Sequence, residues 1–384
     1  MIKREVETEL VKLAKQFKAV AVVGPRQSGK TTLTRHIFNV KPYVNLENPD
    51  SRRFALDDPR GFLSQYGAGA VIDEAQRAPE LFSYLQQVLD EDNKKGKFIL
   101  TGSNNFLLQE SISQSLAGRI AYIYLLPFTL SELSVTGITD LKVQILKGSY
   151  PPVYDQNIDY DKWYPNYLRT YVERDVRQLK NISDLNTFER FLRLCAGRTG
   201  QLLNMSNLAI ETGVDSKTAS AWLAVLESSF ISFRLYPYHR NYNKRIVKMP
   251  KLYFYDTGLI CSLLGINSKD QLYLHPLYGS IFENLIISEI KKYCFNRAKN
   301  ENPFFWRDNI GHEIDIILEK SDGLFPVEIK SGKTVTNDFF KGLNYWKSIS
   351  GVDEGAVVYA GDQIQKYSNN NTLVPWFKLD FILD

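Results

Sequence analysis

The chain has 384 residues, of which 44% are hydrophobic, and a formal net charge of +4 at pH 7. This length predicts two or three domains, each large enough to bury a hydrophobic core. A net charge this small means that any nucleic-acid surface must be a local patch. Three cysteines without paired spacing (Cys195, Cys261 and Cys294) and four histidines support neither a disulfide framework nor a structural zinc site.

The N-terminal segment, residues 1–17, reads MIKREVETELVKLAKQF and is charged and amphipathic. It lacks the apolar centre of a signal peptide. No later stretch approaches the length that a membrane-spanning helix needs. We therefore expect a cytoplasmic protein without membrane contact.

Residues 24–31 read GPRQSGKT, a complete GxxxxGK[ST] phosphate loop between an apolar run and a stretch compatible with a helix. Gly24 and Gly29 let the backbone curl so that its N–H groups point at phosphate oxygens. Lys30 adds a point charge, and Thr31 adds a hydroxyl group for Mg²⁺. The residues predicted to bind MgATP are Gly24, Pro25, Arg26, Gln27, Ser28, Gly29, Lys30, Thr31 and Thr32.

A second apolar run, residues 70–72, ends in two adjacent carboxylates. Asp73 is predicted to complete the Mg²⁺ shell opposite Thr31. Glu74, one residue further along, is predicted to orient and deprotonate the attacking water. Hydrolysis of ATP is therefore expected in addition to binding.

A third run compatible with a strand, residues 98–101, ends in a polar stretch. Such side chains can sense the γ-phosphate, and we favour Asn104 over Ser103 for this role. A plain turn rich in serine and asparagine is the alternative.

These three runs resemble AAA-type ATPases of the additional-strand class, in which the sensor strand lies between the phosphate-loop strand and the acidic strand. The resemblance covers about residues 15–135. Four segments within it are similar to one prokaryotic family, namely VNLENPDSR (44–52), VIDEAQ (71–76), LTGSNNF (100–106) and SLAGR (115–119). That family joins an AAA-type ATPase to a poorly characterised C-terminal domain.

The resemblance also implies a role for Arg119 as an arginine finger or sensor. Its side chain would reach a γ-phosphate in the same or in a neighbouring subunit. Such a role in a neighbouring subunit implies a homo-oligomer, and a ring is the expected form. A simple arginine at a helix end is the alternative.

Gly148, Pro151 and Pro152 interrupt secondary structure after the ATPase part. The predicted domains are residues 1–145, 146–255 and 256–384. In the middle domain, Gly213 permits a sharp turn between two helices, and Asp215 or Ser216 caps the second. Residues 230–238 alternate as a strand, so the pattern predicts a winged helix-turn-helix.

A basic segment follows, residues 239–251, which holds five cations and no acidic residue. Its predicted nucleic-acid contacts are Arg240, Tyr242, Lys244, Arg245 and Lys248, with Lys251 as a further cation. Cations neutralise phosphates and aromatic rings stack on bases, which favours DNA as a partner. A lid or a protein-contact surface is the alternative.

The C-terminal third places Glu283 on a helix, Asp315 on one strand, and Glu328 and Lys330 on the next. Residues two apart on a strand share a face, and a hairpin brings Asp315 beside them. Three carboxylates could bind Mg²⁺ or Mn²⁺ while Lys330 activates water. The arrangement resembles the PD-(D/E)XK restriction-endonuclease-like fold, although Glu313 and Ile314 stand before Asp315 where that signature has a proline.

The expected fold class is therefore α/β: a P-loop AAA-type ATPase, a winged helix-turn-helix and a restriction-endonuclease-like domain. The expected function is a Mg²⁺-dependent ATPase that couples ATP binding and hydrolysis to binding or remodelling of DNA, possibly branched DNA. Two alternatives stay open. One is an ATP-gated, metal-dependent DNA nuclease of a repair or defence system. The other is an ATP-dependent switch or scaffold that binds a protein partner.

Overall fold

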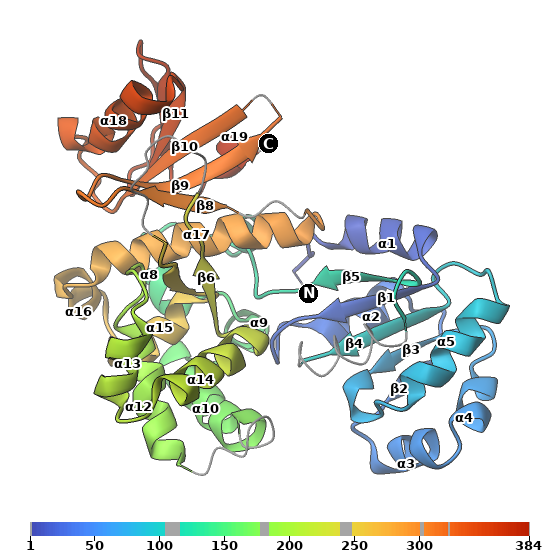
Figure 1. The fold of residues 1–384 in the computed structure, drawn as a ribbon. Coiled ribbons are helices and arrows are strands. Elements are labelled where there is room, and N and C mark those ends of the chain that lie inside the picture. The colour runs from blue at the N-terminus through green and yellow to red at the C-terminus, as the bar shows by residue number, and fades with distance from the viewer. Residues whose placement is uncertain are drawn as a thin grey trace.

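The computed structural model describes residues 2–103, 116–176, 184–238, 248–299, 303–321 and 323–383. The described chain has an N-terminal part built on a five-stranded sheet, a helical middle part and a C-terminal part built on a six-stranded sheet (Figure 1). None of its helices is both long enough and apolar enough to cross a membrane.

The N-terminal part alternates strands and helices. Its elements are α1 (Glu7–Gln16), β1 (Ala19–Val23), α2 (Lys30–Ile37), β2 (Tyr43–Asn45), α3 (Pro49–Asp57), α4 (Pro59–Gln65), β3 (Ala70–Asp73), α5 (Leu81–Glu91), β4 (Phe98–Gly102) and β5 (Ile120–Tyr124). The five strands are parallel in the order β2-β3-β4-β1-β5. Strand β4 therefore lies between β1 and β3, as the additional-strand class requires.

Strand β1 shows why this sheet forms. Its sequence AVAVV is buried throughout, which is typical of a parallel strand covered on both faces. Ala19, Ala21 and Val23 join one hydrophobic cluster, whereas Val20 and Val22 join the cluster that includes α1 and α2. The strand period of two thus sends successive side chains to opposite layers. The carboxyl ends of β1, β3 and β4 meet at one edge of the sheet.

The middle part is mainly helical. Its elements are α7 (Leu130–Leu133), α8 (Leu141–Lys147), α9 (Pro151–Asp155), α10 (Tyr160–Thr170), a π-helical turn (Tyr171–Val176), α12 (Leu185–Ala196), α13 (Met205–Thr212), α14 (Ser216–Ser228), β6 (Ser232–Leu235), β7 (Lys251–Phe254), α15 (Thr257–Leu264) and α16 (Lys269–Leu274). Helices α13 and α14 meet at Gly213, whose φ of 81° suits glycine. Asp215 caps α14 by accepting hydrogen bonds from two backbone N–H groups.

The C-terminal part contains α17 (Tyr278–Asn296), β8 (Phe304–Arg307), β9 (Glu313–Lys320), β10 (Gly323–Lys330), α18 (Lys341–Ser350), β11 (Gly355–Tyr359), β12 (Gln365–Lys366), β13 (Asn371–Pro375) and α19 (Asp380–Leu383). The strand order is β12-β13-β11-β10-β9-β8. The pairs β10–β11 and β11–β13 are parallel, while β8, β9 and β10 form an antiparallel meander.

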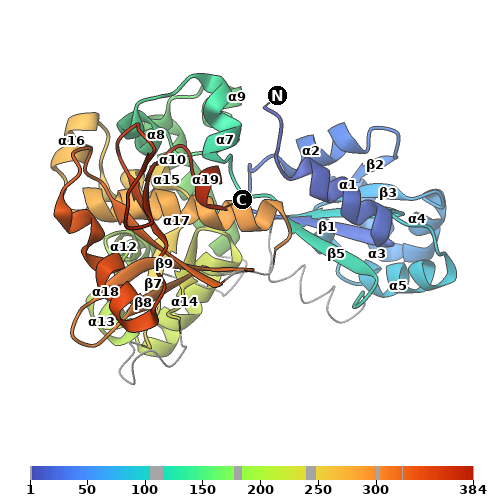
Figure 2. The ribbon, with the colours of Figure 1, turned by 90° about the horizontal axis from the view of Figure 1, so that it is seen from above.

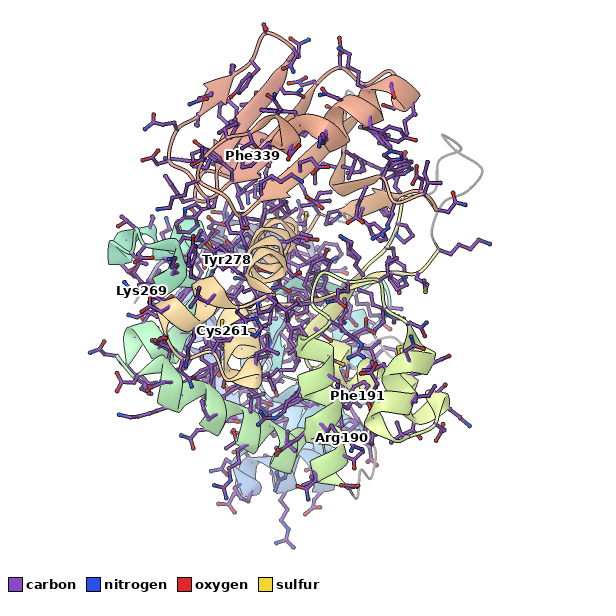
Figure 3. The ribbon with its side chains drawn as sticks, turned by 90° about the vertical axis from the view of Figure 1, so that its left-hand side faces the viewer. Arg190, Phe191, Cys261, Lys269, Tyr278 and Phe339 are labelled. Carbon is purple, nitrogen blue, oxygen red and sulfur yellow. The ribbon has the colours of Figure 1, made fainter. Side chains whose placement is uncertain are left out.

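Helix α17 is the central element of the molecule. It runs between the C-terminal sheet and the middle helices, and its C-terminal end lies beside the ATPase part (Figures 1 and 2). Tyr278, at its start, lies between Phe339 of the C-terminal part and Cys261 of α15 (Figure 3). Most of its turns are buried because it contacts β5, β7, β10 and α15. This helix links all three parts of the chain.

Candidate functional site

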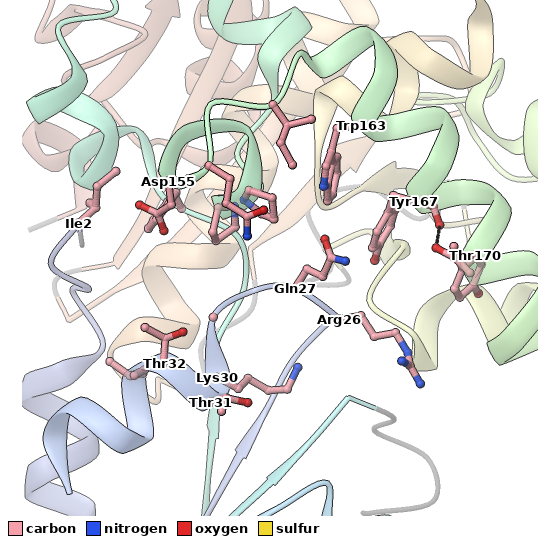
Figure 4. Close-up of a pocket in the computed structure, with 18 of the residues that line it drawn as sticks. Ile2, Arg26, Gln27, Lys30, Thr31, Thr32, Asp155, Trp163, Tyr167 and Thr170 are labelled. Atoms are coloured by element: carbon pink, nitrogen blue, oxygen red, sulfur yellow. Dashed lines mark hydrogen bonds between the residues drawn. The ribbon is translucent and has the colours of Figure 1, made fainter. Parts of the chain in front are cut away.

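A cavity of about 760 Å³ separates the phosphate loop from helices α9 and α10 (Figure 4). Residues 26–32 supply one wall, apart from the buried Ser28. Asp155 of α9 and Trp163, Tyr167 and Thr170 of α10 supply the opposite wall. Cavities of 300–1,000 Å³ hold small ligands in other proteins, so this volume is in the range for a nucleotide.

The backbone of the phosphate loop has the shape that the motif predicts. Gly29 has φ 93° and stands directly before α2, whose N-terminal N–H groups open toward the cavity. A Cβ atom at Gly24 would lie 2.0 Å from the carbonyl oxygen of Leu125, so only glycine fits there. The Lys30 ammonium group donates to the carbonyl oxygens of Gly24 (2.9 Å) and Pro25 (2.6 Å).

Asp73 lies beside Thr31, as expected for a shared Mg²⁺ site. The Thr31 hydroxyl donates to Asp73 Oδ2 at 2.9 Å. Two further hydroxyls donate to this buried carboxylate, namely those of Tyr43 (2.6 Å) and Thr101. Burial and the hydrogen bond to Asp73 raise the pKa of Tyr43, so the phenol remains a donor.

Tyr43 and Thr101 were not among the site residues predicted from the sequence. Thr101 ends the apolar run that becomes β4. Because β4 pairs in parallel with the acidic strand β3, the position of Thr101 in that run could have placed its hydroxyl near Asp73. Tyr43 begins β2, a strand of three residues whose pattern is too short to reveal its place.

Glu74 stands at the cavity in an uncommon backbone conformation. Its φ of 54° and ψ of 44° lie in the left-handed region, which non-glycine residues seldom adopt. The Glu74 N–H donates to the Thr101 hydroxyl (3.2 Å), and its carboxylate accepts from Gln76 (2.6 Å) and Ser103 (3.2 Å). Backbone strain held by such contacts is common at functional sites. The predicted sensor Asn104 falls outside the described residues.

Arg119 does not join this site. The register of β1 and β5 pairs Ala19 with Ile120, so Arg119 lies at the amino end of β1. The phosphate loop follows the carboxyl end of that strand, about 16 Å away at about 3.3 Å per residue. Arg119 instead forms a bidentate ion pair with Asp90 (2.5 and 2.9 Å). A role at the nucleotide of its own subunit is therefore wrong, and a role in a neighbouring subunit stays a prediction.

The C-terminal strands do bring the predicted quartet together. The β9–β10 register pairs Ile316 with Val327, which sets Asp315 opposite Glu328. Asp315 accepts a hydrogen bond from the Ile329 N–H (2.7 Å), and Glu328 pairs with Lys330 (2.5 Å). Burial, followed by the charges of Glu328 and Glu283, raises the pKa of Asp315 well above its ordinary value.

The metal site expected from Glu283, Asp315 and Glu328 is not formed. In the described part of the chain, no group of three or more His, Cys, Asp or Glu side chains is placed to hold a metal ion. The cause is Lys251, which the sequence had indicated as a phosphate-contacting cation of the basic segment. Lys251 is buried and forms ion pairs with Glu283 (3.0 Å) and Glu313.

The structure describes only residues 248–251 of the basic segment. Arg240, Tyr242, Lys244 and Arg245 lie outside the described residues. Lys248 is described and exposed, whereas Lys251 is 3% exposed and cannot contact a phosphate.

A buried polar network joins the phosphate loop to α17, and no sequence motif predicted it. Arg4 donates to the carbonyl oxygens of Ser28 (2.9 Å) and Leu126 (2.7 Å) and pairs with Glu132 (3.1 Å). The side chains of Arg4 and Glu132 are 5% and 1% exposed. The N-terminal segment thus fastens the phosphate loop to the turn after β5.

Side chains of helix α17 form hydrogen bonds with the same turn. Glu289 accepts from the Leu130 N–H (2.6 Å) and pairs with Lys292 (2.7 Å). Lys292 also donates to the Phe128 carbonyl (2.8 Å) and the Ser149 hydroxyl (3.1 Å). The nucleotide cavity and α17 are therefore connected through one short stretch, residues 126–130.

The fold and the cavity define a P-loop protein with an AAA domain. Residues 16–134 match the family model described as AAA domain. Residues 138–270 and 278–379 match two models described as domains of unknown function, DUF8612 and DUF4143.

The chain is 30% identical over 379 residues to the uncharacterized proteins Rv2008c of Mycobacterium tuberculosis and Mb2031c of Mycobacterium bovis. Each alignment covers 97% of this chain and 83% of the relative. The chain belongs to the family of these mycobacterial proteins.

One similar solved structure is the Walker-type ATPase PABY2304 of Pyrococcus abyssi. It is 16% identical, and the alignment covers 68% of this chain and 96% of that one with a TM-score of 0.46. Similarity at this level carries no functional argument.

Proposed function

We propose that this protein is a Mg²⁺-dependent ATPase. The observation that carries the proposal is the meeting of the phosphate loop, the Thr31–Asp73 hydrogen bond and the carboxylate of Glu74 at one cavity. The hydroxyl of Thr31 and the carboxylate of Asp73 are hard oxygen donors, which suit Mg²⁺. When bound there, the ion would neutralise charge on the β- and γ-phosphates.

Side chains of the phosphate loop and of the carboxyl ends of β3 and β4 would bind the phosphates and activate the attacking water. The Lys30 ammonium group donates to the carbonyl oxygens of Gly24 and Pro25, and Lys30 lines the cavity, so this cation lies where phosphate oxygens of a bound nucleotide would come within its reach. Glu74 would orient the attacking water and accept its proton. Gln76 and Ser103 hold that carboxylate in place through their hydrogen bonds.

The test is ATP turnover by the Lys30→Ala variant. We expect a loss of about 10²–10³-fold, the size found when one charge-stabilising donor is removed. Lys12→Ala is the matched control, because Lys12 is 60% exposed and pairs only with Glu9 in the ion pairs of the described chain. Normal turnover by Lys30→Ala would overturn the proposal.

The cavity also suggests how turnover reaches the rest of the chain. One wall is the phosphate loop, and the other is formed by α9 and α10 of the middle part. A nucleotide in the cavity contacts both, so exchange of ATP for ADP would shift their spacing. Helix α17, fastened to residues 128–130, would carry that shift to the C-terminal part.

We propose DNA as the partner of the C-terminal half. The helix pair α13–α14 with the antiparallel strands β6 and β7 supports a winged helix-turn-helix, and the basic segment stands between these two strands in the sequence. Binding of linear duplex, single-stranded and branched DNA would be measured by fluorescence anisotropy at several salt concentrations. Replacing Arg240, Lys244 and Arg245 by alanine should reduce the salt slope by about 2–3 if each neutralises one phosphate.

The control for that experiment removes three exposed lysines elsewhere, namely Lys162, Lys269 and Lys347. It changes the net charge equally, so an equal loss of affinity would show a nonspecific charge effect. Failure of every DNA to bind at moderate salt, or to alter the ATPase rate, would remove DNA from the proposal.

One observation favours a protein partner as the second candidate function. The exposed face of α14, which a DNA-reading helix would place in the groove, includes Asp215, Ser216, Lys217 and Ser220. It therefore has one cation near its start and little charge to hold a phosphate backbone. Under this proposal the protein is an ATP-dependent switch, and the triple replacement in the basic segment leaves partner binding intact.

The topology of the C-terminal part supports a relation to the PD-(D/E)XK fold, which we also propose. Glu283 lies on a helix, and Asp315, Glu328 and Lys330 lie on adjacent antiparallel strands beside it. The fold alone does not establish cleavage, since function depends on the site.

A further inference from the structure

Lys251 is a buried cation at the start of β7, the strand that follows the basic segment. Its side chain is 3% exposed. Its ammonium group pairs with Glu283 of α17 at 3.0 Å and with Glu313 of β9. Two residues further along the same face of β7, the Tyr253 hydroxyl donates to the same oxygen of Glu283. The strand therefore presents a cation and a phenol to one helix carboxylate.

Every carboxylate of this cluster accepts from a protein donor. The contacts are Glu283 with Lys251 and Tyr253, Glu313 with Lys251 and Arg307, Asp315 with the Ile329 N–H, and Glu328 with Lys330. Helix α18 closes the cluster further, because a Cβ atom at Gly342 would lie 2.0 Å from Glu328 Oε1. A Mg²⁺ ion would need near-octahedral oxygens at about 2.0–2.1 Å from a single point. One oxygen of each of Glu283, Asp315 and Glu328 already accepts from an ammonium group, a phenol or a backbone N–H.

The charges of the cluster are almost balanced without a metal. Three cations, Lys251, Arg307 and Lys330, face four carboxylates. Burial would lower the pKa of Lys251, but Glu283, Glu313 and Asp315 outweigh burial and raise it. The four carboxylates thus exceed the three cations by a single charge, which leaves little negative charge to attract a divalent ion.

We infer that the Lys251 ammonium group is the resident cation of this cluster and keeps divalent metal ions out of it. The C-terminal part then acts as a metal-independent binding module, and the basic segment is anchored to it through β7. The inference does not rest on the proposed ATPase, because it concerns contacts at the opposite end of α17 from residues 128–130.

The experiment measures Mn²⁺ binding to the full, nucleotide-free chain by the loss of the free-ion signal in electron paramagnetic resonance. Wild type and Asp315→Asn should bind the same number of Mn²⁺ ions. Lys251→Met should bind one ion more, and Lys251→Met combined with Asp315→Asn should lose it again. Lys347→Met is the control, since it removes an equal charge from an exposed pair with Asp353.

A wild-type chain that binds one Mn²⁺ ion more than Asp315→Asn would overturn the inference. So would a folded Lys251→Met variant that gains no ion. If Lys251→Met does not fold, the comparison of wild type with Asp315→Asn decides alone. DNA incubated with Mn²⁺ gives an independent readout, because cuts that vanish in Asp315→Asn would show that the lysine does not exclude the metal.

Discussion

The phosphate loop and the C-terminal cluster use the same residue types and differ in what surrounds the lysine. Lys30 donates to backbone carbonyl oxygens beside a cavity of about 760 Å³. Lys251 is held by carboxylates in the interior. The carbonyl oxygens that accept from Lys30 carry no net charge and lie at the cavity, whereas Glu283 and Glu313 neutralise Lys251 in the interior. A lysine at the wall of a cavity suits a ligand site, whereas a lysine buried among carboxylates belongs to a closed ion-pair cluster.

The largest effect should come from replacing Glu74, the carboxylate at the nucleotide cavity. Glu74→Gln keeps the shape of the side chain and one oxygen that can accept from Gln76 and Ser103, but it removes the basicity of the carboxylate. General-base catalysis contributes about 10²–10⁴-fold, so kcat should fall by that factor while ATP binding remains. Turnover is measured by phosphate release and binding by a fluorescent nucleotide. Glu91→Gln on the surface of α5 is the control, and loss of both binding and turnover in Glu74→Gln would contradict the proposed role.

The ion pair behind the phosphate loop should show the next largest effect. Arg4→Met leaves Glu132 buried without its cation and frees the carbonyl oxygens of Ser28 and Leu126. Breaking a buried pair in this way costs about 3–5 kcal/mol. The free energy of unfolding is measured in urea. Arg53→Met breaks an ion pair with Asp57 whose side chains are 84% and 71% exposed, so its effect should be near the measurement error.

The closed cluster predicts a pH dependence of opposite sign to that of an ordinary surface aspartate. Burial, Glu328 and Glu283 raise the pKa of Asp315 in the folded chain. The folded state then binds more protons than the unfolded state above about pH 3.9, so ionisation of Asp315 destabilises the fold as pH rises. Between that pH and the raised pKa of the folded state, Asp315→Asn should gain stability relative to wild type by about 1.4 kcal/mol per pH unit, and the gain should level off above the raised pKa.

The control for this series is Asp215→Asn. The hydroxyl of Thr218 and nearby N–H groups lower the pKa of Asp215, so its contribution is present at neutral pH and is lost as pH falls. In urea unfolding followed from about pH 2 to 9, the destabilisation by Asp215→Asn should disappear below about pH 4, whereas Asp315→Asn should gain stability relative to wild type above that pH. Parallel slopes would show that Asp315 is not held in a closed, negatively charged cluster.

The sequence predicted the parts of the molecule that depend on local pattern. The phosphate loop and the adjacency of Thr31 and Asp73 follow from motifs whose residue types determine the local backbone, and the strand order was implied by the resemblance to AAA-type ATPases. Lys251 was misassigned because a run of cations along the chain does not reveal which side chain turns inward once a strand pairs. The network of Arg4 and Glu289 joins segments far apart in sequence, so no spacing could indicate it.

Replacement of Arg119 should show the smallest effect. It tests whether a second copy of the chain contributes a residue to the nucleotide cavity. Arg119 lies at the opposite edge of the sheet from the phosphate loop, in a pair with Asp90 that is partly exposed. Arg119→Ala should therefore change turnover by less than about twofold at protein concentrations where the chain is monomeric, because surface pairs contribute little. Specific activity is measured over a range of protein concentrations, with Asp90→Asn beside it.

The paired variants separate the two roles of this arginine. If Arg119 only stabilises the sheet edge, Arg119→Ala and Asp90→Asn should behave alike at every concentration. If it reaches the nucleotide of a neighbouring subunit, wild type and Asp90→Asn should gain activity on assembly and Arg119→Ala should not. A concentration-dependent gain that only Arg119→Ala loses would mean that the nucleotide cavity is completed by a second copy of the chain, whereas the Lys251 cluster is complete within one.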